Sequence, residues 1–576
     1  MTPEIRQIND NSKIVDSIQT PSGRSQSEPP TGIGMGRDVN ASGQCESFLE
    51  QMPLELKYKI IDSLDLPAAT LLKRTCSNLK NAIKDGDVLA KAWYERFPSA
   101  HQARLETIVS AKDDNQLQDW LGRFTNDKAL IKSLIARRES NEFVAIFYFT
   151  MSELMSKCKT FELVEKGEIS HGDRVKSATF SADDHHLVTK TASNGHNIAK
   201  ISGQDIIGSW DVKANIPHTA FINSAAFSSD GNHLVTASDD GSVKIYGQQA
   251  DGSWEAKHTI IHGLRVNSAS FSPDGAFLVT ASEDCTAKIY GLKADGSWVP
   301  KASIDHGNSV SSATFSADGR YVITAATDNK LRIYCREDDG SWLLKDTIPH
   351  HSHLHTAFFS PDDTHLVTVG QILLDAMDLF ISATSACYDT VKIFGQMDDE
   401  CWQEKADIRH RLRVNSAIFS PDGIHVVTAS KDGVAEIYGQ KADGSWKQKA
   451  YIMHQKTVIS ATFSADSRHV VTASYDKTVK IYGLNADGVW KEKASIAHDD
   501  KVNSAIFSND GRHVVTASND KTAKIIGQEI DGTWVEKASI SHQDAVNSAA
   551  FSNDGRYVVT ASDDQTVKIT EIRMGN

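Results

Sequence analysis

Residues 454–498, HQKTVISATFSADSRHVVTASYDKTVKIYGLNADGVWKEKASIAH, contain the pattern that decides the fold. Polar and apolar residues alternate in its first two segments, which is the period of a half-buried strand. The Asp487-Gly488 pair suits a tight hairpin, because both central positions of that turn need positive φ. The stretch therefore predicts four short strands: Val458–Ser464, Val470–Ser474, Val479–Tyr482 and Trp490–Ile496.

The same stretch recurs along the chain, marked each time by Phe-Ser-x-Asp-Gly or a close variant. Six of the eight intervals between successive copies are 44 residues long, and the other two are 47 and 60. A four-stranded unit repeated at this period is typical of a β-propeller blade. Nine units predict nine blades; eight blades with a stray set of strands is the alternative, because the first unit is irregular. The copies begin at Phe180, Phe227, Phe271, Phe315, Phe359, Phe419, Phe463, Phe507 and Phe551.

The two ends of the repeated region predict how the ring closes. The last unit stops after its third strand, Val567 to Thr570, and a strand-like segment outside any unit, Phe161 to Ile169, precedes the first unit. Pairing this segment with the final blade would remove both exposed sheet edges. We therefore expect residues 161–576 to form a closed, mainly β propeller.

These repeats resemble the WD-repeat family over roughly residues 160–576. One departure is plain, because the family's Trp-Asp pair is replaced by Tyr-Gly in most units, and Ile526 and Thr570 stand at that position in two later units. The resemblance implies a WD-repeat-like β-propeller that binds a partner. The replaced pairs include Tyr246-Gly247, Tyr290-Gly291, Tyr438-Gly439 and Tyr482-Gly483.

Every unit also has a histidine nine residues before its phenylalanine, and most units add a threonine and an aspartate that could suggest a hydrolase. A catalytic constellation is needed once, however, and this one recurs in most units. In the WD-repeat family the matching residues form a hydrogen-bonded cluster that fixes the turns of each blade. Histidines spread around a ring are also too far apart to share a metal ion. We expect no catalytic residue, metal or cofactor here. The histidines are His171, His218, His262, His306, His350, His410, His454, His498 and His542.

Three segments precede the expected propeller. Residues 1–46 are rich in Ser, Asn, Gly and Pro, so we expect a disordered tail. Residues 47–87 and 88–160 have apolar residues three or four positions apart, which predicts helices. We expect the second of these segments to be a helical linker that holds the propeller at a fixed distance.

The segment 48–83, FLEQMPLELKYKIIDSLDLPAATLLKRTCSNLKNAI, predicts by its pattern a helical hairpin or small bundle. It resembles the F-box through Met52-Pro53, Glu55-Leu56, Ile60-Ile61, the run from Leu64 to Pro67, and Thr75-Cys76. The resemblance implies contact with a Skp-type adaptor that bridges to a cullin–RING complex. The residues that it assigns to the adaptor are Pro53, Leu56, Ile60, Ile61, Leu64, Pro67 and Leu71.

Comparison of the units with one another indicates where a target could bind. Two sets of positions vary, those after each histidine and those before each turn aspartate, and in the WD-repeat family both lie around the central channel. Variable loops on a fixed scaffold are the expected place for specificity, and neutral drift is the alternative. Arginines there could meet a phosphorylated or acidic target. An extra segment, about 369–384, enters the fifth unit on the same face, either as a contact patch or as a self-packed excursion. The candidate target-binding residues are Arg174, Arg265, Arg413, Lys431, Tyr475 and Lys501.

Bulk properties limit the function classes. The net charge of −14 argues against broad binding to nucleic acid or anionic lipid, and the longest apolar stretch, Phe143 to Phe149, is too short to span a membrane. No secretory signal is visible, and seven irregularly spaced cysteines indicate free thiols in the cytoplasm. The sequence thus predicts a non-catalytic substrate-recognition subunit of an SCF-type ubiquitin ligase. A scaffold unrelated to ubiquitin is the alternative, and a propeller enzyme comes third. The low divergence between repeats, the Tyr-Gly pairs and the polar N-terminus resemble propellers of intracellular bacteria and symbionts, and this resemblance implies a secreted effector that uses a ligase in the host cytoplasm.

Overall fold

The computed structural model describes residues 87–191, 197–205, 208–371, 389–397, 401–529 and 531–575. The predicted tail and the F-box-like segment lie outside these residues, and Asp87 is the one described residue of the predicted helical segment 47–87. The same is true of most of the predicted insertion. Its first residues, Val369 to Gln371, belong to the second strand of the fifth unit, and residues 372–388 are not described.

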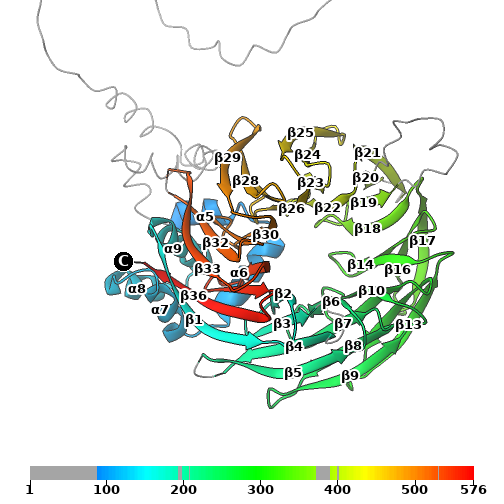
Figure 1. Cartoon of the computed structure of the whole chain (residues 1–576), viewed down its shortest axis with the longest axis horizontal. Helices are drawn as coiled ribbons and strands as arrows, with labels where there is room; N and C mark the ends of the chain where they lie inside the picture. The colour runs from blue at the N-terminus through cyan, green and yellow to red at the C-terminus, as the bar shows by residue number, and fades with distance from the viewer. Residues whose placement is uncertain are drawn as a thin grey trace, which may run out of the picture. The chain divides into compact units, whose positions relative to one another are not determined.

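The predicted propeller is confirmed, with nine blades of four antiparallel strands each (Figure 1). The alternative of eight blades with a stray strand set is wrong, because the irregular first unit forms a complete sheet. Blade 1 has β2 (Val175–Phe180), β3 (His186–Thr191), β4 (Asn197–Gln204) and β5 (Trp210–His218); blade 2 has β6 (Ile222–Phe227), β7 (His233–Ser238), β8 (Ser242–Gln248) and β9 (Trp254–Ile261); blade 3 has β10 (Val266–Phe271), β11 (Phe277–Ser282), β12 (Thr286–Leu292) and β13 (Trp298–Asp305).

The next three blades contain the same four strands. Blade 4 has β14 (Val310–Phe315), β15 (Tyr321–Ala326), β16 (Lys330–Arg336) and β17 (Trp342–Pro349); blade 5 has β18 (His353–Phe359), β19 (His365–Gln371), β20 (Asp389–Gln396) and β21 (Trp402–His410); blade 6 has β22 (Val414–Phe419), β23 (His425–Ser430), β24 (Val434–Gln440) and β25 (Trp446–Met453).

Blades 7 and 8 repeat the same pattern, whereas blade 9, the last, takes its outer strand from the beginning of the repeated region. Blade 7 has β26 (Val458–Phe463), β27 (His469–Ser474), β28 (Thr478–Leu484) and β29 (Trp490–Ala497); blade 8 has β30 (Val502–Phe507), β31 (His513–Ser518), β32 (Thr522–Gln528) and β33 (Trp534–Ser541); blade 9 has β34 (Val546–Phe551), β35 (Tyr557–Ser562), β36 (Thr566–Met574) and β1 (Phe161–Ser170).

The predicted closure of the ring is confirmed by the pairing of β1 with β36. Ile169 pairs with Val567 at one end of the ladder and Phe161 with Met574 at the other, with a bulge between Glu165 and Gly167. Ile169 is buried in a cluster with apolar residues of β36 and with Trp210 of blade 1. The closing strand therefore fills the junction between the last and first blades as well as the sheet edge.

Hydrophobic clusters between neighbouring blades form the core of the propeller. In one of them Val279 of blade 3 packs with Val310 and Trp342 of blade 4. The second strand of each blade lies in the middle of this packing, and β31 and β35 are buried along their whole length. This explains why the second strands read as near-continuous runs such as Val-Val-Thr-Ala-Ser.

The turns between first and second strands also link the blades. Most of these turns have a glycine at positive φ, but three have Asp184, Asp363 or Ser467 with φ of 59° to 63°. Each of these side chains accepts a hydrogen bond from a backbone N–H of the preceding blade. Asp363, for example, accepts from Ala317 and Asp318 at 2.7 and 2.8 Å. The unfavourable backbone conformation is thus offset by contacts that a glycine could not make.

Five helices precede the propeller in the described residues: α5 (Asp87–Tyr94), α6 (Ser99–Ser110), α7 (Asp114–Gly122), α8 (Lys128–Ile135) and α9 (Phe143–Lys157). Asp113 and Gln116 form a capping box at the start of α7. The apolar stretch from Phe143 to Phe149 belongs to α9 and packs against the other helices, with the Phe147 and Trp120 ring centroids 4.9 Å apart. No helix in the described residues is long and apolar enough to cross a membrane.

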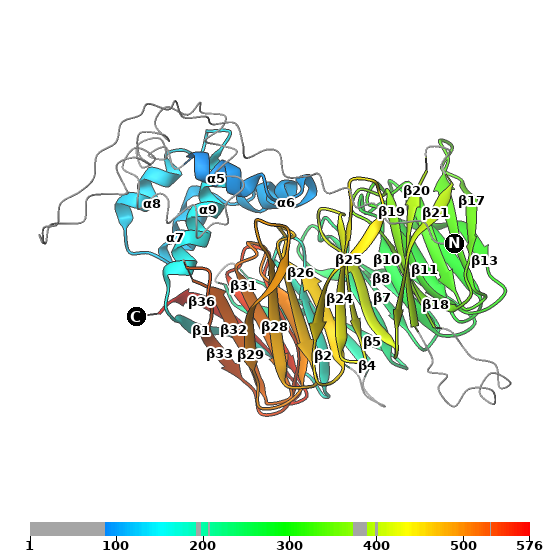
Figure 2. The same ribbon diagram turned by 90° about the horizontal axis from the view of Figure 1, so that it is seen from above.

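The helices dock on one face of the propeller, against the first turns of blades 8 and 9 (Figure 2). His101 contacts the backbone oxygen of Asn509 at 3.0 Å, and Ser152 donates to Asp510 at 3.2 Å. We call this side of the ring the helical face. The loops that enter the first strands and the turns between second and third strands lie at the other ends of the strands, and we call that side the channel face.

Candidate target-binding surface

The His-Thr-Asp clusters expected from the repeats are present in seven blades. In blade 7, His454 lies 2.9 Å from the Asp476 carboxylate through Nδ1 and 2.8 Å from the Thr472 hydroxyl through Nε2. The ring is fully enclosed, so in this arrangement it joins two turns and cannot meet a substrate. The other six pairs are His218–Asp240, His262–Asp284, His306–Asp328, His410–Asp432, His498–Asp520 and His542–Asp564.

Blades 1 and 5 depart from this arrangement. His171 bonds Thr189 at 2.9 Å, but its Nδ1 has no hydrogen-bond partner among the described residues, and the same is true of Nε2 of His350. Burial lowers the pKa of His171 to about 3 and that of His350 to about 4. These two histidines are therefore neutral at physiological pH, and no carboxylate among the described residues takes the place of the aspartate that pairs with the histidine in the other blades.

The surroundings of each cluster determine the protonation state of both its histidine and its aspartate. Burial lowers the pKa of His454, although the nearby Asp476 carboxylate partly opposes that shift. Hydrogen bonds from Thr478, Gln455 and His454 lower the pKa of Asp476 to about 2, despite its burial. A neutral imidazole beside an ionised carboxylate is the arrangement expected of a structural hydrogen bond.

The two variable sets of positions meet in pairs across the blade junctions of the channel face. Arg174, before blade 1, lies 3.9 Å from Asp563 of blade 9, and Arg265, before blade 3, lies 3.8 Å from Asp239 of blade 2. In the same relation, the Lys501 ammonium lies 5.1 Å from the centroid of the Tyr475 ring. A residue after the histidine of one unit thus contacts a residue before the aspartate of the preceding unit.

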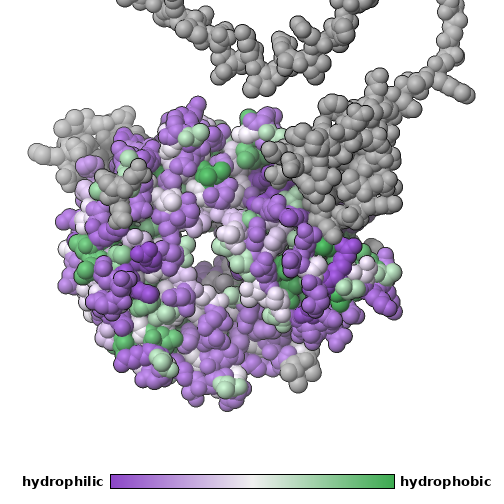
Figure 3. Space-filling model, turned by 180° about the vertical axis from the view of Figure 1, so that it is seen from behind, coloured by the Kyte–Doolittle hydropathy of each residue, from purple (hydrophilic) through white to green (hydrophobic). Residues whose placement is uncertain are grey.

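The inner edge of this face contains a set of asparagines that the sequence analysis missed. Each donates through its side-chain amide to a backbone oxygen in the next blade; for example, Asn415 donates to Val458 at 2.7 Å. First strands of neighbouring blades contact one another, so these bonds run around the opening at the centre of the ring (Figure 3). In these units an Asn directly follows the first apolar residue of the first strand, and this recurrence is the sequence signal that could have revealed the set. The asparagines are Asn223, Asn267, Asn415, Asn503 and Asn547.

Charge is divided unevenly over the channel face. Basic side chains gather on blades 6 to 8, and we call this group the basic sector: Arg411, Arg413, Lys431, Lys456, Lys477 and Lys501. Among the described residues, no hydrogen bond or ion pair engages the side chains of the first four. Acidic residues gather on blades 9, 2 and 3, as Asp544, Asp563, Asp239 and Glu283, and two more, Asp499 and Asp500, lie beside Lys501 at the blade 8 end of the basic sector.

Four of the six predicted target-binding residues lie in or beside the basic sector: Arg413, Lys431, Tyr475 and Lys501. The other two, Arg174 and Arg265, are on the same face but beside carboxylates of neighbouring blades, so their charges are already balanced. Leu412, between two arginines of the sector, is 49% exposed and adds an apolar contact. Target binding by all six residues stays a prediction.

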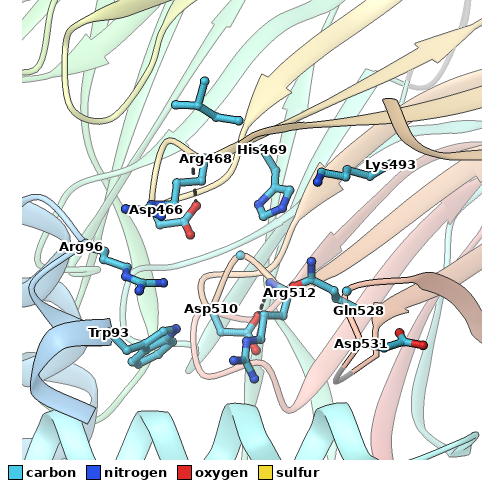
Figure 4. A pocket seen from close by; sticks show the side chains of 13 residues that line it. Trp93, Arg96, Asp466, Arg468, His469, Lys493, Asp510, Arg512, Gln528 and Asp531 are labelled. Carbon is cyan, nitrogen blue, oxygen red and sulfur yellow. Dashed lines mark hydrogen bonds between the residues drawn. The ribbon is translucent and has the colours of Figure 1, made fainter. Parts of the chain in front are cut away.

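A pocket lies on the helical face, between α5 and blades 7 and 8 (Figure 4). It has a volume of about 130 Å³. The residue Trp93 and the arginine that follows α5, Arg96, form one wall, and strand ends and turns of the two blades form the others. Both basic and acidic side chains line it.

The predicted adaptor-binding residues, Pro53 to Leu71, lie outside the described residues, so their contacts stay a prediction. The described helices begin at Asp87, directly after the region that contains the F-box-like segment. The helical period predicted for residues 88–160 corresponds to α5 through α9.

Comparison with known proteins identifies the repeats. The family described as "WD domain, G-beta repeat" matches residues 212–247, 254–291, 298–335, 404–438, 446–483, 490–526 and 534–570. These seven matches end in the third strands of blades 2, 3, 4, 6, 7, 8 and 9, which are the blades with a His-Asp pair. The chain therefore contains a β-propeller built from WD40 repeats, in which blades 1 and 5 are divergent copies. The match does not extend to residues 48–83.

Solved structures of WD40 proteins are distantly similar. Saccharomyces cerevisiae Sqt1 is 14% identical, with a TM-score of 0.46 over 62% of this chain and 97% of that chain. The C-terminal WD40 domain of Sif2 is 15% identical, with a TM-score of 0.45 over 71% of this chain and 98% of that chain. Chaetomium thermophilum Sqt1 bound to the N-terminus of the ribosomal protein L10 is 16% identical, with a TM-score of 0.46 over 72% and 100%. No curated protein matches this sequence.

Proposed function

We propose that this chain is a non-catalytic protein-interaction subunit whose propeller binds a target protein on the channel face of blades 6 to 8. The observation that carries the proposal is the basic sector. In a chain of net charge −14, four neighbouring basic side chains have no hydrogen bond or ion pair among the described residues. Like charges held together without partners repel one another, and an acidic ligand would relieve that repulsion.

The chemistry of the sector favours an acidic or phosphorylated segment of the target. Arg411 and Arg413 offer planar guanidinium groups that can bind carboxylate or phosphate through two parallel hydrogen bonds. Leu412 and the Tyr475 ring supply apolar contact between the charges. Aromatic and arginine side chains together are typical of the residues that dominate binding energy at interfaces.

The first experiment compares Arg413→Glu/Lys431→Glu with the wild-type chain. The probe is a fluorescent peptide of alternating glutamate and serine, with the serines either free or phosphorylated, and the readout is anisotropy. We expect the double variant to bind at least about tenfold more weakly, and wild-type binding to weaken with salt. The control is Arg320→Glu, a reversal at an exposed arginine on the helical face of blade 4. Equal binding by the double variant and the wild type contradicts the proposal.

We also propose a finer function, that the chain couples its target to an SCF-type ubiquitin ligase. The F-box-like pattern of residues 48–83 supports it, together with the docking of the following helices on the face opposite the basic sector. Such a subunit acts by positioning, since it raises the local concentration of a target lysine near a ubiquitin-carrier enzyme. It would act in the cytoplasm, or in a host cytoplasm if the protein is a secreted bacterial effector.

Calorimetry with a purified Skp-type adaptor tests the finer function. We expect the full chain to bind, and the triple variant Pro53→Ala, Leu56→Ala, Ile60→Ala to lose binding. If a folded wild-type chain does not bind the adaptor, the ligase proposal is wrong. The protein-interaction proposal would then remain, because its test uses a different face of the molecule.

A further inference from the structure

The pocket on the helical face has two parts of the chain as walls. Trp93 of α5 and Arg96 face strand ends and turns of blades 7 and 8, among them the residues around Arg468 and Arg512 (Figure 4). A further basic residue, Lys493 of β29, borders the same space. Four cations, each from a different strand, turn or helix end, therefore surround one small volume.

Arg468 stands out when the chain is compared with itself. Four blades have an arginine after the first turn, and three of these blades, 7, 8 and 9, are neighbours, with Arg468, Arg512 and Arg556; the fourth arginine is Arg320 of blade 4. Arg512 pairs with Glu153 of α9 at 3.3 Å, and Arg556 lies between Asp554 and Glu571. Among the residues that the structure describes, Arg468 has no such side-chain partner.

The acidic residues of the pocket are already engaged by their own turns. Asp466 accepts from the Ser464 hydroxyl at 2.6 Å and from the Arg468 backbone N–H at 3.1 Å. Asp531 accepts from the backbone and hydroxyl of Thr533 at 2.9 and 2.7 Å. These carboxylates therefore fix turn geometry.

Asp510 also accepts several hydrogen bonds. Among the cations of the pocket, Lys493 has only a neutral hydrogen-bond partner. Asp510 accepts from Ser508, from Ser152 of α9 and from the Arg512 backbone N–H. The Lys493 ammonium donates to the neutral side-chain amide of Asn485 at 2.8 Å. Arg468 and Lys493 thus lack a carboxylate partner of their own.

We propose that this pocket binds a phosphate-sized oxyanion, held by Arg468 and Lys493 with Arg96 on the opposite wall. A volume of about 130 Å³ is several times what a single water molecule needs, and it is enough for a phosphate group. Cations approaching from several elements suit the several acceptor oxygens of a phosphate better than the two of a carboxylate. The ion is either free or carried on a phosphorylated side chain. Because the walls belong to α5 and to the propeller, the bound ion would also stabilise their contact.

Titration calorimetry on the full chain at constant ionic strength tests the site. The probes are inorganic phosphate, phosphoserine and acetate. We expect phosphate or phosphoserine to bind and acetate to bind at least about tenfold more weakly. Tighter binding of phosphoserine than of inorganic phosphate would indicate a modified side chain as the natural source, and the reverse would indicate a free ion. Binding of acetate alone would overturn the proposal.

Three variants locate the binding. Arg468→Ala should reduce phosphate affinity at least about tenfold, whereas Arg468→Lys should retain part of it, because the charge stays and the guanidinium fork is lost. Arg320→Ala is the matched control, since Arg320 has the same repeat position in blade 4 but none of the described helices beside it (Figure 2). Unfolding midpoints in chloride buffer verify that each variant is folded, and Lys493→Gln replaces Arg468→Ala if that variant is not. Equal phosphate binding in all variants, or no binding by the folded wild type, would overturn the proposal.

Discussion

Asp476 accepts hydrogen bonds from three residues of blade 7, so the stability of the blade should depend on its side chain. It accepts from His454 at 2.9 Å, from the Gln455 backbone at 2.9 Å and from the Thr478 hydroxyl at 2.6 Å. Asp476→Ala would leave these donors without their acceptor, and we expect a loss of about 2–4 kcal/mol in the free energy of unfolding. Urea denaturation measures it.

The control for this prediction is Asp443→Ala in the outer hairpin of blade 6. Asp443 accepts from the backbone and hydroxyl of Ser445, at 2.9 and 2.5 Å, and is exposed. Water can replace its bonds, so we expect a loss below about 1 kcal/mol. Similar losses in both variants would show that the His-Asp cluster does not stabilise the blade.

The enclosed histidines predict that stability falls in mild acid. Burial lowers the pKa of His171 to about 3, and those of His306 and His350 to about 4. The unfolded chain takes up these protons below about pH 6.5 and the folded chain does not, so stability decreases as pH falls from 6.5 towards 4. Each histidine contributes up to about 1.4 kcal/mol per pH unit. Burial beside Asp554 raises the pKa of Asp184, which offsets one histidine in this window.

Urea denaturation at pH 7.5 and pH 5.5 tests the direction, and His306→Gln should reduce the difference between the two values. The lowered carboxyl pKa values do not interfere, because that of Asp476, for example, is about 2 and its contribution is lost only below about pH 4. Greater stability at pH 5.5 than at pH 7.5 would contradict the role given to the histidines.

Sequence repetition decided which single residues could be predicted. The His-Thr-Asp cluster was predictable because it recurs, and the asparagines that line the channel recur in the same way and could have been found. The pairing of Arg174 with Asp563 was not predictable by spacing, because these residues meet only after the last blade closes on the first. The basic sector could have been found by ordering the variable loops around the ring, since blades follow one another in chain order.

At the scale of elements, the sequence predicted nearly all strands and the ring closure. Alternation and turn residues predict strands directly, whereas the completeness of blade 1 was uncertain because its turn residues differ from those of the other blades. Asp184 illustrates the difference, since it stands where most units have glycine and bonds to backbone N–H groups of Asn553 and Asp554 in blade 9. Such a contact depends on the neighbouring blade, so the sequence of the turn alone cannot show it.

The closing strand provides the prediction at this scale. Ile169 of β1 is 3% exposed and packs in the junction between blades 9 and 1. Ile169→Asp would place a carboxylate in that cluster, and we expect a loss of at least about 3 kcal/mol and faster hydrogen exchange along β36. Glu168→Gln, at the exposed neighbouring position, should change neither quantity. Unchanged exchange in β36 of the Ile169→Asp variant would mean that the ring does not depend on this strand.

At the scale of the whole molecule, the docking of the helices on the propeller was beyond sequence reasoning. The contacts join residues more than 350 positions apart, such as Glu153 with Arg512, and no repeat marks them. The Arg123 guanidinium lies 2.7 Å from Glu571, whose side chain is 1% exposed. Buried ion pairs of this kind hold two parts in one orientation, because separating them leaves a charge without a partner. The role of residues 88–160 as a fixed spacer stays a prediction, because the F-box-like segment lies outside the described residues.

A double-mutant cycle on Glu153 and Arg512 tests whether the docking is rigid. The Arg512 side chain is 9% exposed, so Glu153→Ala leaves a nearly buried cation without its partner, and we expect a loss of about 3 kcal/mol. Arg512→Ala in the same chain should recover part of that loss, giving a coupling energy of at least about 1 kcal/mol. The exposed pair Lys91–Glu142 is the control, and its coupling should stay below about 1 kcal/mol.

Hydrogen exchange of α9 should rise in Glu153→Ala while the second strands of blades 2 to 6 keep their protection, because the helices contact blades 8 and 9. If α9 and those strands lose protection together, the helices and the propeller unfold as one unit, and the docking contacts are part of a common core.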